Sequence, residues 1–153
     1  MIESSKIYID FAKFLKVEAK KIEEIEQKHL KIWYEWLSKK VPSLTPHARA
    51  FILSCKGGKK IRGALINLGY QIAGGKSHDI LDIAAAYEIF HTSILAHDDV
   101  IDQSSTRRGE MTVSYKWSNS VSVLMGDYLF AKAFKTLVGV DSAQIMKILS
   151  QAT

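Results

Sequence analysis

The chain has 153 residues, of which 47% are hydrophobic, 24% charged and 10% aromatic, with nine Gly and only two Pro. This composition excludes collagen-like, disordered and disulfide-built proteins and is ordinary for one compact globular domain. Lys and Arg total 21 against 16 Asp and Glu, and the net charge of +5 favours anionic partners such as phosphorylated small molecules, anionic lipid or nucleic acid.

Cysteine content and hydropathy favour a cytoplasmic location. Cys55 is the only cysteine, so no internal disulfide can form and a reducing compartment is expected. No stretch approaches the roughly 18 uncharged apolar residues of a membrane span, and the first residues lack the pattern of a signal peptide. We therefore expect neither a transmembrane segment nor a leader.

Apolar residues recur at helical spacing along nearly the whole chain, which predicts an all-α fold. Residues 5–40 are expected to form two helices or one bent helix, with their Lys and Glu residues on a solvated face. Pro42 and Pro46 mark the next break, and Thr45 is a candidate cap for a short helix that runs to Ser54.

The middle of the chain carries the most apolar segments. A buried helix is expected over 60–72, ended by a pair of glycines. After Ser77, a candidate N-cap, the stretch 80–101 fits a long helix at the centre of a bundle, and the polar residues 103–110 indicate a loop.

Two more helices are expected, over 121–138 and from residue 142 onward. Asp141 or Ser142 is the candidate cap of the second. Its apolar stripe continues to the last residue without a C-cap glycine or a breaker, which is typical of a helix that stops in mid-course.

Three carboxylates, Asp98, Asp99 and Asp102, lie at the C-terminal end of the central helix. The helix dipole disfavours negative charge there, and like charges at i and i+4 repel, so a compensating cation is expected. Asp98 and Asp102 lie about 6 Å apart along one helix face, which suits Mg²⁺ bound to a phosphorylated substrate. Apolar residues precede them, which indicates a cavity mouth; a solvated salt-bridge cluster is the alternative.

Two histidines lie near these aspartates. His91 falls within about 20° of Asp98 and Asp102 on a helical wheel, so it is a candidate phosphate contact. The alternative is a core histidine held by a hydrogen bond. His97 is the weaker candidate, and it is expected either to be a packing residue or to support the aspartates.

Basic residues occur in two segments on either side of this helix. Arg107 and Arg108 precede a glycine in the predicted loop, and guanidinium groups bind phosphate oxygens in a bidentate manner. Lys59 and Arg62 lie at a predicted helix N-terminus behind two glycines, where backbone N–H groups and the dipole also favour anions. Together the segments predict a pocket for two polyanionic substrates, of which only one needs the metal.

Four segments in register resemble the (E)-prenyl diphosphate synthases of the polyprenyl synthetase family: GGKKIRGAL, EIFHTSILAHDDVID, RRGEMTVSYKW and GDYLFAKAF. The resemblance implies the orthogonal helical bundle of isoprenoid synthases. It also implies Mg²⁺-assisted 1′-4 condensation of isopentenyl diphosphate with an allylic diphosphate through an allylic carbocation.

The family's second aspartate-rich motif, which lies well downstream of the first, does not occur in the 51 residues after Asp102. The chain is therefore expected to be the N-terminal half of such a domain, with a helical extension over about 1–44 and motif-bearing helices over about 45–153. Little or no activity is expected from it alone.

The resemblance also implies the roles of single residues. Isopentenyl diphosphate would be held by four side chains: Lys59, Arg62, His91 and Arg108. Asp98 and Asp102, with Asp99 as a further candidate, would bind Mg²⁺ bridged to the allylic diphosphate, and Arg107 would contact that diphosphate. Asp98, Asp102 and Arg107 are thus the implied catalytic residues.

Product length is set in this family by bulky residues one or two turns before the aspartates. Ser93 is small at that position, so growth beyond farnesyl is expected, to twenty carbons or more. Phe90 or Tyr87 is a candidate floor of the product tunnel. Gly63 stands where the family usually has Pro, a difference expected to affect local helix rigidity.

Several alternatives remain. The chain fits a homodimer, a heteromer with another synthase chain, or a noncatalytic or split subunit of a heteromeric synthase. A class I terpene cyclase also uses an aspartate-rich helix with Mg²⁺, but it needs no isopentenyl diphosphate site. A nucleic-acid partner is not expected, because the lysines are spread over several helices with glutamates between them.

Overall fold

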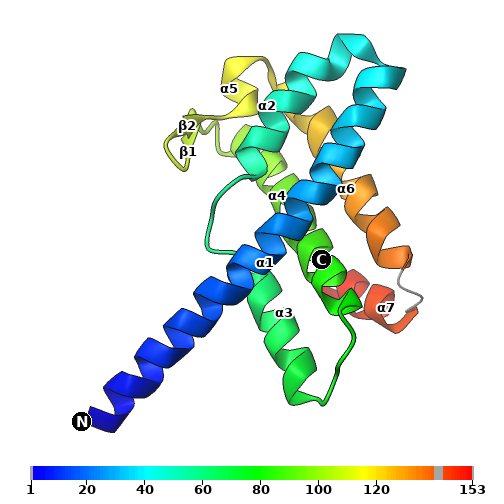
Figure 1. Cartoon of the computed structure of the whole chain (residues 1–153). Helices are drawn as coiled ribbons and strands as arrows, with labels where there is room; N and C mark the ends of the chain where they lie inside the picture. The colour runs from blue at the N-terminus through cyan, green and yellow to red at the C-terminus, as the bar shows by residue number, and fades with distance from the viewer. Residues whose placement is uncertain (1, 140–142, 153) are drawn as a thin grey trace.

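The computed structural model describes residues 2–139 and 143–152, and within them the fold consists of seven α-helices, one 3₁₀ turn and one short hairpin (Figure 1). The predicted all-α class is confirmed. No helix among the described residues is long and apolar enough to cross a membrane.

The first helix, α1 (Ile2–Lys40), is continuous over the segment for which one or two helices were expected. Its buried positions repeat every four or seven residues along one face: Glu18, Ile22, Glu26, Leu30 and Leu37. The expectation that the glutamates of this segment are solvated is therefore wrong for Glu18 and Glu26, which lie on the buried stripe.

A 3₁₀ turn (Pro42–Leu44) leads into α2 (Thr45–Cys55). The prediction that Thr45 caps this helix is wrong. Thr45 already has helical dihedrals, φ −54° and ψ −45°, and the N-cap position is taken by Leu44, whose side chain cannot accept a hydrogen bond. The 3₁₀ turn supplies the entry to the helix instead.

The central helix, α4 (Asp79–Ile101), packs against α1, α3 (Ile61–Ile72) and α6 (Asn119–Val138), as Figure 1 shows. Its predicted place at the centre of the bundle is confirmed. The helix begins one residue later than a Ser77 cap requires, although the Ser77 hydroxyl still accepts a hydrogen bond from the Asp79 N–H at 3.1 Å.

The expected loop over 103–110 contains an antiparallel hairpin of β1 (Thr106–Arg107) and β2 (Glu110–Met111). Arg108 and Gly109 form its two-residue turn with φ of 55° and 84°, and positive φ at both positions is what a type I′ turn requires. Strands of two residues are too short to produce an alternating pattern, which is why the sequence did not reveal them.

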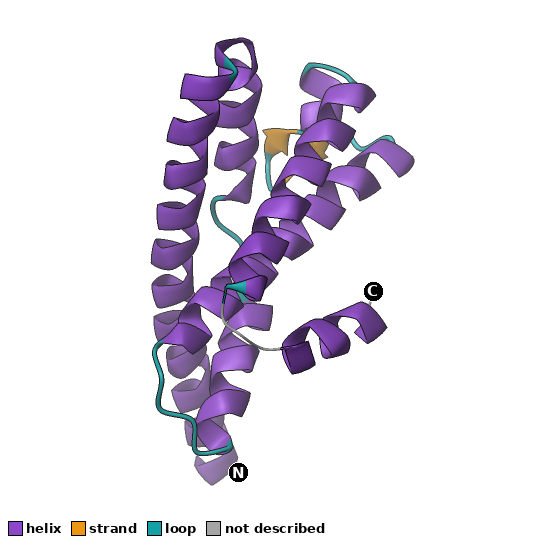
Figure 2. Cartoon of the chain, turned by 90° about the vertical axis from the view of Figure 1, so that its right-hand side faces the viewer, coloured by secondary structure: helices purple, strands orange, loops and turns teal. Residues whose placement is uncertain are grey.

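The hairpin is followed by α5 (Val113–Lys116), a single turn that was also not predicted. Ser118 caps α6, which starts two residues before the predicted position. The last helix is α7 (Ala143–Ala152), and its predicted caps at 141 and 142 lie outside the described residues. Figure 2 shows the hairpin at the same end of the bundle as α2.

Candidate functional site

The C-terminal end of α4 is joined to the hairpin through a buried carboxylate. Arg107 Nε donates to Asp99 Oδ1 at 2.7 Å, and Arg107 Nη2 lies 2.7 Å from the same oxygen. This bond raises the pKa of Arg107 above its usual value, and the charges of Asp98 and Asp102 add to the effect. Asp99 is 6% exposed, so its role in the structure is to hold Arg107 beside the other two aspartates.

Asp98 and Asp102 differ from Asp99 because they are accessible. They lie one helical turn apart, and neither makes a side-chain hydrogen bond or ion pair within residues 2–139 and 143–152. Two free carboxylates on one face fit a hard divalent cation. The described part of the chain contains no cluster of three or more His, Cys, Asp or Glu that could hold a metal, so the remaining ligands would be substrate oxygens and water.

The two basic segments predicted from the sequence meet in space. Arg108 Nη1 donates to the carbonyls of Lys56 at 3.2 Å and Gly57 at 3.3 Å, which joins the hairpin turn to the loop between α2 and α3. Lys59 and Arg62, on and just after that loop, are exposed. The loop and the turn therefore form one basic surface beside α4.

His91 lies among these charges. Burial lowers its pKa, the cations Arg62 and Arg108 lower it further, and Glu88 and Asp98 act in the opposite direction. His91 is thus neutral at pH 7 and able to donate one hydrogen bond. The structure brings it together with the basic surface and with Asp98, as the predicted helical stripe required.

Three carboxylates beneath the basic surface were not found by sequence reasoning. Glu26 Oε2 lies 2.5 Å from Lys60 Nζ, Glu23 Oε1 accepts from the Gly57 N–H at 3.0 Å, and Glu88 Oε1 accepts from the Gly63 N–H at 2.9 Å. Glu26 is fully buried. Its four-residue spacing from Ile22 and Leu30 was the available indication, because it places Glu26 on the apolar stripe of α1.

A hollow of about 480 Å³ opens below the arginines. Its walls include Thr92, Leu95 and Ala96 of α4, and Arg107 and Arg108 also border it. Apolar side chains in the wall of the hollow thus lie beside guanidinium groups at its border, which suits a ligand with an anionic head and an apolar chain.

The residues predicted to limit product length lie elsewhere. Ser93 is fully buried, and its hydroxyl donates to the Phe90 carbonyl at 2.6 Å. The Phe90 ring packs 5.2 Å from Phe130 and 5.9 Å from Tyr87 between ring centroids. Neither Ser93 nor Phe90 lines the hollow, and their effect on product length stays a prediction.

His97 packs against α6, which fits the packing role, one of the two roles expected for it. Its Nε2 lies 3.2 Å from Asp127 Oδ1, and a Cβ at position 126 would come within 2.6 Å of the same nitrogen. Gly126 therefore allows the close approach of the two helices at this point.

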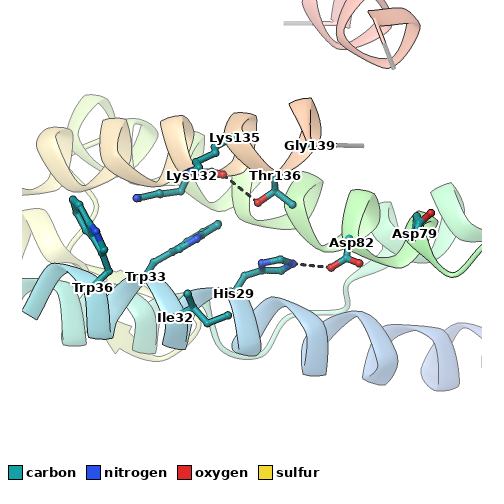
Figure 3. Close-up of a pocket in the computed structure, with 10 residues that line it drawn as sticks. All are labelled: His29, Ile32, Trp33, Trp36, Asp79, Asp82, Lys132, Lys135, Thr136 and Gly139. Carbon is teal, nitrogen blue, oxygen red and sulfur yellow. Dashed lines mark hydrogen bonds and ion pairs between the residues drawn. The ribbon is translucent and has the colours of Figure 1, made fainter. Parts of the chain in front are cut away.

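A second hollow, of about 820 Å³, lies between α1, α6 and the start of α4. Figure 3 shows His29 pointing to Asp82, with 2.8 Å between His29 Nε2 and Asp82 Oδ1, and Lys132 lies 4.4 Å from the centroid of the Trp36 ring. Asp82 and Asp98 are about 25 Å apart along α4 at 1.5 Å per residue. None of the residues predicted to bind substrate or metal lines this hollow.

Comparison with known proteins finds relatives that are named as prenyl diphosphate synthases. The family described as "Polyprenyl synthetase" matches residues 47–153. The octaprenyl diphosphate synthase of Escherichia coli (strain K12) is 36% identical over 96 residues, which are 63% of this chain and 30% of that protein. The short chain isoprenyl diphosphate synthase of Methanothermobacter thermautotrophicus is 34% identical over 127 residues, 81% of this chain and 39% of that protein. The chain thus spans 30–39% of the length of these two relatives.

Similar solved structures come from the same kind of protein. The heptaprenyl diphosphate synthase from Staphylococcus aureus matches with a TM-score of 0.72 and 31% identity, over 90% of this chain and 41% of that chain. A polyprenyl synthase from Caulobacter crescentus CB15, complexed with calcium and isoprenyl diphosphate, matches with a TM-score of 0.75 and 29% identity, over 92% and 42%. The chain therefore has the fold of part of the helical bundle in these solved structures, as predicted.

Proposed function

Because the chain belongs to the polyprenyl synthetase family, we propose that it carries the isopentenyl diphosphate site and the first metal site of an (E)-prenyl diphosphate synthase. The reaction would be the 1′-4 condensation of isopentenyl diphosphate with an allylic diphosphate. In this proposal residues 45–153 form part of the synthase domain and residues 1–44 a helical extension of it. The family match from residue 47 onward supports that division.

The observation that carries the proposal is the meeting of the two basic segments beside His91. We assign isopentenyl diphosphate to the surface formed by four side chains: Lys59, Arg62, His91 and Arg108. Arg108 Nη1 already bonds to the Lys56 and Gly57 carbonyls, so the loop and the turn are held together before any ligand binds. Preorganised donors of this kind bind an anion without the free-energy cost of assembling them.

The allylic diphosphate is assigned to Asp98, Asp102 and Arg107. The two carboxylates would hold Mg²⁺, which when bound neutralises the charge of the departing diphosphate. Asp99 engages Nε and Nη2 of Arg107, and we assign the contact with the diphosphate to Nη1. The bond to Asp99 raises the pKa of Arg107 above its already high usual value, so Arg107 is a cation when the diphosphate binds.

The reaction requires two diphosphates to bind at two different sites. The bond between C1 of the allylic chain and its diphosphate breaks, and the electron pair leaves with the diphosphate. The double bond of isopentenyl diphosphate then attacks the carbocation, and the adduct loses a proton to the released diphosphate or to water, which forms the double bond of the product. Isopentenyl diphosphate keeps its own diphosphate throughout, so that group must bind where no metal assists its departure. One site with metal-binding carboxylates and one site without them meets that requirement.

Binding of labelled isopentenyl diphosphate tests the assignment. Lys59→Ala and Arg62→Ala should each weaken binding about tenfold or more, because each removes a charge-assisted contact. Lys76→Ala removes an exposed lysine outside the site and is the matched control. Equal binding by all three variants and the unmodified chain would reject the site.

A second candidate is a subunit that acts only together with another synthase chain, as a homodimer or a heteromer. The incomplete ligand set at Asp98 and Asp102 favours this candidate, because no cluster of three or more potential metal ligands occurs among the described residues. We expect little turnover from the 153 residues alone. Robust product formation without a partner would exclude the second candidate.

A further inference from the structure

The loop that carries Lys59 has an unusual backbone. Gly57, Gly58 and Lys60 all have positive φ, of 75°, 83° and 44°. Glycine adopts such angles readily, but a lysine with its Cβ does so only when the surrounding structure requires it. The feature that holds Lys60 in this conformation therefore controls the path of the chain between Lys59 and Arg62.

Lys60 is held by its own side chain. It is 4% exposed, its Nζ lies 2.5 Å from Glu26 Oε2, and it donates to the Cys55 carbonyl at 3.0 Å. Glu26 is fully buried on α1, and one turn earlier Glu23 accepts from the Gly57 N–H at 3.0 Å. Two carboxylates of α1 thus hold the two ends of the same short loop.

Stability alone does not account for the buried pair. Burial raises the pKa of Glu26 to about 7 although Lys60 attracts its charged form, so the loss of hydration outweighs the attraction. Buried ion pairs of this kind add little to stability and can instead select one conformation. The conformation selected here is the positive φ of Lys60, between two exposed cations of the basic surface.

We propose that Glu26, acting through Lys60, is a positioning residue for isopentenyl diphosphate, because the pair fixes the backbone that presents Lys59 and Arg62. This inference rests on the proposed function. It extends the functional part of the chain to α1, since Glu26 lies before residue 47, where the family match begins. The allylic site at Asp98 and Asp102 does not depend on the pair.

The test compares Glu26→Gln with Glu24→Gln in the full 153-residue chain. Gln keeps the size of the side chain and removes the charge, and Glu24 is an exposed glutamate of the same helix. Calorimetry at pH 8, where Glu26 is ionised, measures the affinity for isopentenyl diphosphate and, with Mg²⁺, for farnesyl diphosphate. Hydrogen exchange measures the protection of the amides of residues 57–63.

Glu26→Gln should bind isopentenyl diphosphate about tenfold more weakly, since misplaced contacts lose much of their energy. Its affinity for farnesyl diphosphate with Mg²⁺ should stay within about twofold of the unmodified value, and the loop amides should exchange faster. Glu24→Gln should change none of these. A general structural defect would instead weaken both ligands alike, and that result would overturn the proposal.

A second variant covers the case in which Glu26→Gln does not fold. The double variant Glu26→Gln with Lys60→Met removes both buried charges, so it should fold and still bind isopentenyl diphosphate weakly. Full affinity in either folded variant would overturn the proposal. If the unmodified chain binds no isopentenyl diphosphate, the proposed function fails. Hydrogen exchange then tests the further inference separately: if the amides of residues 57–63 exchange as slowly in a folded variant as in the unmodified chain, Glu26 does not hold the loop.

Discussion

The guanidinium of Arg108 lies directly against the backbone of Gly58. A Cβ at position 58 would come within 2.9 Å of Arg108 Nη2 and 3.0 Å of its Cζ. Gly58 also has a φ of +83°, so both its missing side chain and its conformation allow the hairpin turn to meet the loop between α2 and α3. The basic surface depends on this glycine.

The first prediction concerns Gly58→Ala, with Gly74→Ala as its control. Both glycines have a φ of +83°, but nothing lies within 4 Å of a Cβ at Gly74. Both variants should lose about 1 kcal/mol of unfolding free energy from the strained backbone. Only Gly58→Ala should also weaken isopentenyl diphosphate binding, because it displaces Arg108. Urea denaturation and calorimetry measure the two effects, and equal binding by both variants would contradict the account.

The second prediction separates the aspartates of α4. Asp99→Asn should lower the unfolding free energy by about 1 to 2 kcal/mol, because it weakens a buried charge-assisted bond to Arg107. Asp102→Asn should leave stability unchanged or raise it by a few tenths of a kcal/mol, since it removes a negative charge from a helix C-terminus.

Mg²⁺ binding should show the opposite order. In the presence of farnesyl diphosphate, Asp102→Asn should lose most of the Mg²⁺ affinity, whereas Asp99→Asn should retain more of it. Calorimetric titration with Mg²⁺ checks this. A larger loss for Asp99→Asn would mean that Asp99 is a metal ligand, which its bond to Arg107 argues against.

The sequence predicted the long elements well and the short ones poorly. Apolar residues at helical spacing over many turns predicted α4 and α6, because a stripe of that length is not expected from a strand or a loop. The hairpin and α5 contain too few residues for any period to show. The residues of the candidate site were proposed for a similar reason, since the helix dipole disfavours carboxylates at the C-terminal end of an apolar helix.

What sequence reasoning did not predict depends on tertiary contacts. Helical spacing placed Asp98 and Asp102 on one face and left Asp99 as a further metal candidate, and only the hairpin, which brings Arg107 to Asp99, shows that Asp99 is paired with an arginine. Glu26 lies in a segment rich in Lys and Glu, so it was expected to be solvated like its neighbours, although its spacing from Leu30 matched the buried stripe. The partners of a charged residue on such a stripe come from another element, so spacing alone does not identify them.

The third prediction concerns the pH dependence of stability. Burial raises the pKa of Glu26 from 4.5 to about 7, with Lys60 opposing the shift and Glu88 and Glu23 adding to it. Between these values the folded chain holds a proton that the unfolded chain has lost, so Glu26 lowers stability as the pH rises from about 4.5 to about 7.

Glu26→Gln does not titrate and should remove this contribution. The unfolding free energy of the unmodified chain, minus that of the variant, should fall by up to about 3 kcal/mol between pH 5 and pH 8. The variant itself shows the effect of the remaining groups, including His91, whose lowered pKa acts in the opposite sense. Urea denaturation at several pH values measures the difference, and a constant difference would contradict the buried state of Glu26.

The fourth prediction concerns Gly63→Pro, which introduces the residue expected from the family resemblance. Proline has no N–H, so the buried Glu88 carboxylate would lose its donor. Gly63→Ala keeps the N–H, and both variants bring a Cβ within 3.1 Å of the Ala84 carbonyl. Gly63→Pro should therefore be less stable than Gly63→Ala by about 1 to 3 kcal/mol. Equal stability of the two would show that Glu88 has another partner.

The central claim is that one chain holds two diphosphates at separate sites, of which only one needs a metal. Calorimetric titration of the 153-residue chain with isopentenyl diphosphate and with farnesyl diphosphate, each with and without Mg²⁺, tests it most directly. Isopentenyl diphosphate should bind in both conditions and farnesyl diphosphate only with Mg²⁺, and Asp98→Ala should abolish the second binding alone. Loss of both in Asp98→Ala, or binding of neither ligand to the unmodified chain, would contradict the account.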